Sequence, residues 1–239
     1  MLKTKIAVLA ATGLMASCVG AENTVEANIR KNIEPRLGGA KIDTITATPY
    51  SGLYELRIGG DILYADKKGE FLFIGQVYEA KTSRNITKAR IDDLNKIKFS
   101  DLPLASALKQ VKGDGKRVIA VFEDPNCGYC KRLRQTTLKD IDNVTIYTFM
   151  YNILSEDSFT KSKNIWCAPD RVKAWDDWMI NGKVPAATPA NCETPNQKIV
   201  ELGQKLKIQG TPAIFFTDGT RIPGAVDLPA LEAKLDSIK

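Results

Sequence analysis

The sequence predicts a small α+β domain followed by a larger α/β domain that carries a helical insert. Two changes of texture along the 239 residues support this division. Between residues 41 and 80 the chain consists of short runs rich in β-branched and aromatic residues, separated by tight turns. After residue 103, apolar runs typical of buried strands alternate with helical patterns, as in α/β domains.

Residues 22–85 form the predicted α+β domain. A helix is expected over 24–34, because Val25, Ile29 and Ile33 recur at four-residue spacing. A core built from about sixty residues is small, so we expect this domain to gain stability by dimerising. Strands are expected at residues 41–48, 53–58, 61–64 and 71–78.

Residues 86–102 are predicted to form a linker, helical over 86–99, and residues 103–239 the second domain. An apolar strand at 117–122 leads into a Cys-Gly-Tyr-Cys motif, and Asp218-Gly219 is a strong hairpin turn. The other expected strands are 144–151, 213–216 and 220–222, and the expected helices are 131–138, 158–167, 171–180, 196–206 and 228–238. This order is that of a thioredoxin-like fold, with a helical insert at about 152–194.

The first 21 residues have the pattern of a secretory signal peptide. Lys3 and Lys5 precede a short run of apolar and small residues, and Val19-Gly20-Ala21 is a small-residue cleavage site. We therefore expect cleavage after Ala21 and export of the mature chain. Cys18 leaves an alternative open, because the residues before it loosely resemble a lipoprotein box.

Composition excludes several classes of function. The chain has no histidine, so Ser-His-Asp and Cys-His catalysis, zinc sites of mixed cysteine and histidine, and haem ligation by histidine are excluded. The net charge of +6 falls to +4 when cleavage removes Lys3 and Lys5, and the basic residues are spread along the chain. We expect no nucleic-acid partner. After residue 21 no apolar run reaches the length of a transmembrane helix.

Cleavage would remove Cys18 and leave four of the five cysteines. An even number in an exported chain suggests two disulfides. Adjacency favours the pair Cys127 and Cys130, which leaves Cys167 to pair with Cys192 as a structural bridge across the insert. Such a bridge contributes roughly 3 kcal/mol, and two buried free thiols are the alternative.

Cys127 and Cys130 are the predicted catalytic residues. Disulfide exchange needs a thiolate that attacks and a second thiol that resolves the mixed disulfide. At a helix start, Cys127 would face unpaired N–H groups and the positive end of the helix dipole, which lower a thiol pKa. A zinc site is the alternative, but it needs a second close cysteine pair, so we predict no metal and no cofactor.

Thr211-Pro212 is the second predicted element of the site. Threonine before proline at the start of an apolar strand favours a cis peptide bond that packs against the cysteines and offers backbone to an extended substrate. Lys131 is interpreted as a solvated helix side chain. Glu123 and Asp124 could take a proton from Cys130 if buried, but solvated carboxylates are expected. Core positions are expected for Trp166, Trp175 and Trp178.

With these motifs the mature chain resembles the DsbC/DsbG family of periplasmic thiol:disulfide isomerases, and the DsbC branch most closely. Beyond the Gly-Tyr dipeptide between the cysteines, the resemblance lies in the segments Val118–Cys130, Ile165-Trp166-Cys167, Ala174-Trp175-Asp176-Asp177 and Gly210-Thr211-Pro212-Ala213. It implies a homodimer formed through residues 22–85, misfolded disulfide-containing exported proteins as substrates, and a membrane thiol reductase of the DsbD type as partner. One departure is Lys131, where familiar members have histidine; a permanent charge there is expected to shift the redox potential.

The predicted function is isomerisation, with reduction, of incorrect disulfides in exported proteins. Three alternatives remain at this stage: a net oxidase, a dedicated reductant of one partner, and a holdase chaperone whose cysteines matter little. Replacing Cys127 with serine separates the last of these from an exchange enzyme, because chaperone activity would survive the change.

Overall fold

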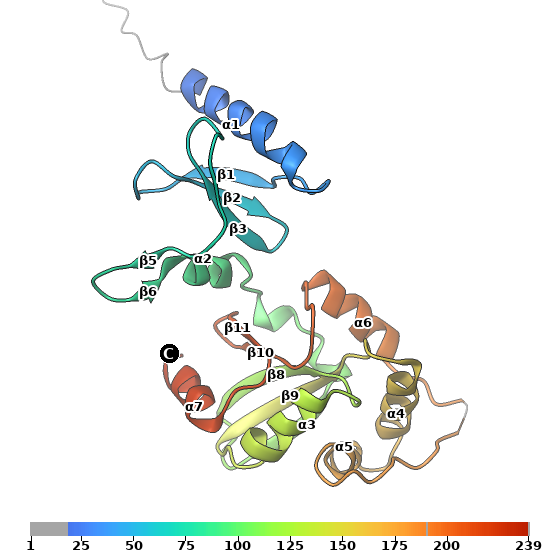
Figure 1. Ribbon diagram of the computed structural model, residues 1–239. Helices are drawn as coiled ribbons and strands as arrows, with labels where there is room; N and C mark the ends of the chain where they lie inside the picture. The colour runs from blue at the N-terminus through green and yellow to red at the C-terminus, as the bar shows by residue number, and fades with distance from the viewer. Residues whose placement is uncertain (1–18, 190, 239) are drawn as a thin grey trace, which may run out of the picture. The chain divides into compact units, whose positions relative to one another are not determined.

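A computed structural model describes residues 19–189 and 191–238, and the chain divides into two compact units between Ile91 and Asp92 (Figure 1). Most of the predicted signal peptide, including Cys18, lies outside the described residues. Within the described ranges, no helix is both long and apolar enough to cross a membrane.

The first unit packs one helix against a four-stranded antiparallel sheet of order β1-β2-β3-β4. Ile29 and Ile33 of the helix are buried against Leu56 and Ala65 of the sheet, so the predicted apolar spacing marks the true core face. The helix begins earlier than predicted. The bounds are α1 (Val19–Ile33), η1 (Glu34–Arg36), β1 (Thr44–Ala47), β2 (Tyr54–Ile58), β3 (Asp61–Ala65) and β4 (Leu72–Phe73).

The prediction of one continuous strand over 71–78 is wrong. The chain instead forms β4, which pairs with β3, and then β5 (Tyr78–Glu79), which pairs with β6 (Arg84–Asn85) in a separate ribbon. Leu72 packs against the core of the first unit, but most apolar residues of this segment do not. The exposed ones are Phe71, Phe73, Ile74 and Tyr78. The run therefore forms an apolar surface of the first unit, and we call it the Phe71–Tyr78 surface.

The predicted helix over 86–99 ends early, as α2 (Ile86–Leu94). Further on, the Ile97 amide donates a hydrogen bond to the Gly219 carbonyl at 3.0 Å, which fixes this segment on the Asp218-Gly219 turn of the second unit. Gly219 has a φ of 83°, and a Cβ there would lie 2.2 Å from the Ile97 carbonyl oxygen. Two short 3-10 turns follow, η2 (Phe99–Asp101) and η3 (Leu104–Ser106).

The second unit is built on a five-stranded sheet of order β11-β10-β8-β9-β7. Strands β8 and β9 are parallel and the other pairs antiparallel. The bounds are β7 (Leu108–Lys112), β8 (Arg117–Glu123), β9 (Val144–Met150), β10 (Ala213–Phe216) and β11 (Arg221–Pro223). Strand β7 was not predicted, because it is a short, lysine-rich edge strand with two exposed residues. The predicted hairpin of β10 and β11 is confirmed.

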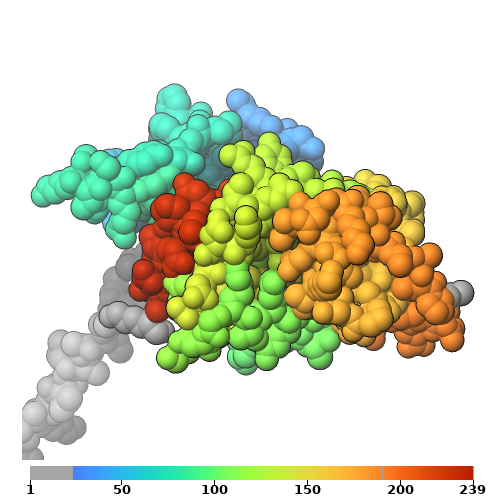
Figure 2. Space-filling model, turned by 90° about the horizontal axis from the view of Figure 1, so that it is seen from below, coloured from blue at the N-terminus to red at the C-terminus, as the bar shows by residue number. Residues whose placement is uncertain are grey.

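Helices cover both faces of this sheet. Ile119 and Val121 of β8 pack toward α3, η4 and α7, whereas Ala120 and Phe122 pack toward α6. Figure 2 shows the orange insert and the red closing helix flanking the yellow-green segment that holds η4. The bounds are α3 (Gly128–Leu133), its π-helical continuation η4 (Arg134–Leu138), α6 (Asn196–Lys205) and α7 (Leu228–Asp236). The predicted alternation of strands and helices is confirmed.

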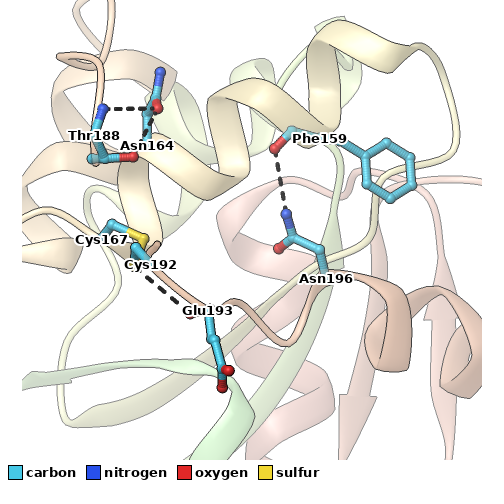
Figure 3. Close-up of a disulfide and its surroundings, with 7 residues drawn as sticks. All are labelled: Phe159, Asn164, Cys167, Thr188, Cys192, Glu193 and Asn196. Carbon is cyan, nitrogen blue, oxygen red and sulfur yellow. Dashed lines mark hydrogen bonds between the residues drawn. A yellow bond between two sulfur atoms is a disulfide. The ribbon is translucent and has the colours of Figure 1, made fainter. Parts of the chain in front are cut away.

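The insert consists of α4 (Glu156–Trp166), α5 (Arg171–Met179) and the loop up to α6. A disulfide joins Cys167 to Cys192, with the two Cα atoms 6.3 Å apart (Figure 3). Beside it, the Asn164 side-chain oxygen accepts hydrogen bonds from the Thr188 amide and hydroxyl, at 3.3 and 3.1 Å. Both contacts hold the loop against the end of α4.

Candidate active site

The site lies where β8 ends and α3 begins. Cys127 is the N-cap of α3, and its amide donates to the Asp124 carbonyl at 3.0 Å, which closes a tight turn between strand and helix. Three residues later, Cys130 lies in the first turn of α3. The C-x-x-C spacing therefore places both sulfur atoms on the same side of the helix start.

Asp124 holds the loops around this turn together. We expected this side chain to be solvated, but it is fully buried. One carboxylate oxygen accepts from the Asn126 amide and the Ser158 hydroxyl, both at 2.8 Å. The other accepts from the Ile153 and Leu154 amides at 2.9 and 3.1 Å. The expectation fails because four donors from two segments replace water around this carboxylate.

Cys127 has the environment of an attacking thiolate. Its side chain is 6% exposed, and its sulfur accepts a hydrogen bond from the Cys130 amide at 3.4 Å. Hydrogen bonding from the Cys130 side chain, aided by backbone amides at the helix start, lowers the pKa of Cys127 to about 5. An ordinary thiol has a pKa of about 8.5, so Cys127 is a thiolate at neutral pH.

Cys130 has the opposite environment. It is fully buried in an apolar cluster with Met150, Ile165 and Trp175. Burial raises the pKa of Cys130, and the hydrogen bond that it gives to Cys127 adds to this effect. Cys130 therefore keeps its proton while Cys127 is charged. Cys127 is the nucleophile, and Cys130 is a protonated thiol that can react in a later step; we call it the reserve thiol.

The Thr211–Pro212 peptide bond is cis and lies against the cysteines. The Cys127 sulfur is 3.3 Å from the Thr211 carbonyl oxygen. Next to this contact is a cavity of about 210 Å³. Its lining includes Ile208, Gly210, Thr211, Pro212, Arg221 and Pro223. An extended chain whose sulfur reached Cys127 would meet this stretch of backbone.

Glu123, also expected to be solvated, is fully buried beneath α3. Its carboxylate accepts from Arg134 Nη2 at 2.6 Å and from Arg134 Nε at 2.9 Å. Arg134 is itself buried, and sequence reasoning did not single it out. Its spacing was the available signal, because it lies four residues after Cys130, on the same side of the helix.

Lys131 is not a freely solvated side chain as expected. Its ammonium lies 4.0 Å from the centre of the Trp178 ring, and the Lys161 ammonium lies 4.8 Å from it. The Trp178 indole N–H donates to the Pro125 carbonyl at 2.6 Å. The insert helix α5 is thus tied to the loop before Cys127. Trp175 is buried as expected, and Trp166 and Trp178 are half-buried.

The zinc alternative does not fit this arrangement. Cys167 and Cys192 are consumed by their disulfide, so they supply no thiolate to complete a four-cysteine site. Across the described ranges, no group of three or more cysteine and acidic side chains converges as metal ligands.

A thiolate and a buried reserve thiol at a helix start, facing a cis-proline, define a thiol–disulfide exchange protein of the thioredoxin-like fold. Residues 104–239 match the thioredoxin-like domain family, and residues 20–88 match the N-terminal domain of disulfide bond isomerase proteins. The chain belongs to the DsbC family of thiol:disulfide interchange proteins.

Similar proteins support this assignment. A probable thiol:disulfide interchange protein DsbC of Bordetella parapertussis is 48% identical over 87% of this chain and 73% of its own. The thiol:disulfide interchange protein DsbC of Salmonella typhimurium is 30% identical over 94% of this chain and 93% of its own. The crystal structure of a disulfide interchange protein from Neisseria gonorrhoeae is 38% identical, with a TM-score of 0.53, over 56% of this chain and 96% of that one.

Proposed function

We propose that the chain is a periplasmic isomerase that corrects, and in part reduces, wrong disulfides in exported proteins. The observation that carries this proposal is the contrast between Cys127 and Cys130. A thiolate that is stable at neutral pH attacks disulfides and also leaves easily, and both properties are needed to shuffle a bond rather than merely make one.

In the first step the Cys127 thiolate attacks one sulfur of a substrate disulfide. A bond forms between Cys127 and that sulfur, and the other substrate sulfur leaves as a thiolate. If this thiolate attacks elsewhere in the substrate, a different disulfide forms and Cys127 is released unchanged, which is isomerisation. If Cys130 attacks Cys127 first, the substrate leaves reduced and Cys127–Cys130 becomes oxidised.

Substrate binding is assigned to the backbone around Thr211 and Pro212. The Thr211 carbonyl oxygen lies 3.3 Å from the Cys127 sulfur. The adjoining cavity gives room for side chains of an extended segment. Backbone recognition suits an isomerase, because it does not depend on the sequence of the misfolded chain.

A homodimer through the first unit is the second part of the proposal. The match of residues 20–88 to an isomerase N-terminal domain supports it, as does the exposed Phe71–Tyr78 surface. A contiguous exposed apolar surface commonly marks an interface. Replacing both Phe73 and Ile74 with glutamate should convert the dimer to a monomer in sedimentation velocity, and an unchanged dimer would contradict this assignment.

Export and a reducing partner complete the proposal. We assign residues 1–21 as a signal peptide cleaved after Ala21, with lipidation of Cys18 as the alternative, and mass spectrometry of the protein from a periplasmic extract distinguishes the two. The Cys167–Cys192 disulfide suits an oxidising compartment. There, Cys127 and Cys130 need a reductant, and a membrane reductase of the DsbD type is the proposed partner; its absence should leave the pair oxidised in cells.

A net oxidase is the second candidate, and the low pKa of Cys127 favours it. A stabilised thiolate stabilises the reduced pair, which makes the disulfide form a stronger oxidant. The two candidates differ in the substrate that they process: a scrambled, fully oxidised protein needs an isomerase, whereas a reduced one needs an oxidase.

The test is reactivation of a scrambled multi-disulfide protein by purified residues 22–239 in a weakly reducing buffer, beside a Cys127→Ser control. We expect the wild type to restore activity and the control to restore none. The control should still suppress aggregation if the protein also acts as a chaperone. Failure of the wild type here, with rapid oxidation of a reduced substrate, would move the assignment to an oxidase.

A further inference from the structure

The cavity beside the cis-proline carries a positive charge that backbone recognition does not use. Its lining combines the backbone of residues 208–212 with Lys207, just after α6, and Arg221, the first residue of β11. Among the described residues that line it, none is acidic. Thr211 belongs to the same lining, and its carbonyl oxygen lies 3.3 Å from the Cys127 sulfur. A substrate bonded to Cys127 therefore lies close to two cations.

Arg221 is held in place by carbonyl groups rather than by a carboxylate. Its Nη1 donates to the Leu206 carbonyl oxygen at 2.9 Å, and its guanidinium carbon lies 5.9 Å from the centre of the Phe215 ring. The side chain is half-buried. Burial lowers the pKa of Arg221, and the charge of Asp92, which does not line the cavity, opposes this change. Arg221 is thus a fixed cation that has lost part of its water, and a carboxylate would be a strong partner for it.

Lys207 has a backbone conformation that lysine does not favour. Its φ is 53°, in the left-handed region where glycine or asparagine usually follows a helix. The Ile208 amide donates to the Gly203 carbonyl at 2.9 Å, which closes the end of α6 in this form. Glycine would satisfy the backbone here, so the exposed ammonium is what lysine adds. Its attraction to the C-terminal end of the α6 dipole is the purely structural explanation.

A second cavity follows directly along the chain, and its charges are balanced. The loop after β11 passes from Gly224, which lines the first cavity, into the wall of the second, whose volume is about 270 Å³. Tyr129 of the redox motif lines this second cavity, together with Arg132 and Asp227. We expect the two flanks of a chain bonded to Cys127 to lie over the two cavities. Only the first cavity then offers a net charge to the substrate.

We propose that Lys207 and Arg221 bind a carboxylate of the substrate, so that Cys127 reacts preferentially with disulfides whose cysteine has acidic residues on one side. The inference rests on the proposed thiol–disulfide exchange and adds a preference for charge to the backbone recognition described above. The chemistry is unchanged: Cys127 bonds to one substrate sulfur, and the other sulfur leaves as a thiolate. The two cations contact neither reacting sulfur, so they determine specificity and are not catalytic residues.

The test measures attack by the mature chain, with Cys127 and Cys130 reduced, on peptides whose single cysteine carries a thiopyridyl group. Cys127 bonds to the peptide sulfur, and the thiopyridyl anion leaves, takes a proton from water and is followed by its absorbance. The peptides carry two aspartates or two asparagines, either before or after the cysteine. We expect aspartates on one side to speed attack about 3- to 10-fold over asparagines, as two partly exposed ion pairs would. Aspartates on the other side should change the rate less than about 2-fold.

Variants of both cations identify the site. Lys207→Gly and Arg221→Gln should each lower the ratio of the acidic to the neutral rate, and the double variant should bring it close to 1. Attack on the neutral peptide should stay within about twofold in all of them. Exposed Lys198, near the start of α6, provides the matched control, because Lys198→Gln removes the same charge and should keep the ratio. In about 1 M salt, where the Debye length is about 3 Å, the wild-type ratio should also fall toward 1.

Stability separates this role from a purely structural one. Lys207→Gly should unfold at an equal or higher urea concentration, because glycine suits the left-handed backbone, while its preference for acidic peptides falls. A lysine that only stabilises the end of α6 would show the reverse, a lower unfolding midpoint with an unchanged preference, and this result would overturn the proposal.

Three other results would overturn it. The first is equal attack on acidic and neutral peptides, and the second is a ratio that survives in the double variant. The third is acceleration by aspartates on both sides of the cysteine, which indicates attraction to a chain of net positive charge rather than to this cavity. Failure of the proposed exchange function is distinguishable from these, because it would appear as no attack on any peptide, acidic or neutral.

Discussion

Cys127 and Cys130 lie three residues apart in one helical turn, yet they differ in almost every physical respect. Cys127 is at the edge of the site, where amides of the helix start and the Cys130 side chain surround its sulfur and hold its pKa near 5. Cys130 is sealed in an apolar cluster, and burial raises its pKa. The local sequence places both at the start of the helix, so the difference comes from what packs on each.

The environments of the two cysteines are completed by parts of the chain that are distant in sequence. On the Cys127 side, the cis Thr211–Pro212 bond brings a carbonyl to the sulfur. On the Cys130 side, Trp175 of the insert closes the apolar cluster. Cys127 is therefore placed to attack the disulfide of a substrate, whereas Cys130 stays neutral until a mixed disulfide forms.

Removing the reserve thiol has the largest expected effect on this division of roles. Cys130→Ser should leave Cys127 able to attack but unable to be released by an internal thiol, so covalent adducts with substrate should accumulate. Net reduction of a protein disulfide should fall to background, as measured by trapping with an alkylating agent and mass spectrometry. The Cys127→Ser variant is the control and should form no adduct. Full reductase activity in Cys130→Ser would contradict the assignment of different roles to Cys127 and Cys130.

A smaller effect is expected from removing hydrogen bonds to Asp124, which holds the loops around both cysteines. Asp124→Asn places an amide N–H₂ where the carboxylate accepts four hydrogen bonds, so at least one donor faces another donor. We expect a loss of about 1.5–3 kcal/mol in the free energy of unfolding by urea, the range for hydrogen bonds to a charged group, together with slower exchange. Asp101→Asn, at a site 69% exposed, is the control and should cost almost nothing. Equal stabilities would contradict the assigned role of Asp124.

The smallest expected effect on chemistry comes from the disulfide of the insert. The Cys167→Ala/Cys192→Ala variant should lose about 3 kcal/mol in the free energy of unfolding, because a 25-residue separation is no longer cross-linked. Attack of Cys127 on oxidised glutathione should stay within about twofold, since neither cysteine touches the site. The Cys127→Ala/Cys130→Ala variant, which keeps the Cys167–Cys192 bridge, is the control for stability. A large loss of attack rate would show that the bridge also shapes the site.

The sequence predicts the Cys127 side of this comparison well, because its signals are local. The C-x-x-C motif lies within four residues at a strand–helix junction, and Thr211-Pro212 is a dipeptide at a strand start. Likewise, β8, β9 and β10 are buried strands, and their nearly continuous apolar composition is enough to predict them.

The Cys130 side is poorly predicted, because it depends on partners that only the fold brings together. Glu123 follows an apolar run and looks like a solvated strand end until Arg134 reaches it from the helix above. Strand β7 mixes one leucine and one valine with lysines and a glutamine at a sheet edge, where short polar strands resemble loops. The segment 71–78 has the composition of a buried strand, but most of its apolar side chains are exposed.

The most direct test of the account is a titration of the two thiols in the reduced mature chain. Thiolate absorbance near 240 nm, with the alkylated residue identified by mass spectrometry at each pH, reports which cysteine is charged. We predict a single thiolate with a midpoint near pH 5, located at Cys127, while Cys130 stays protonated through neutral pH. A midpoint near that of an ordinary thiol, at about pH 8.5, or alkylation of Cys130 before Cys127, would contradict the account.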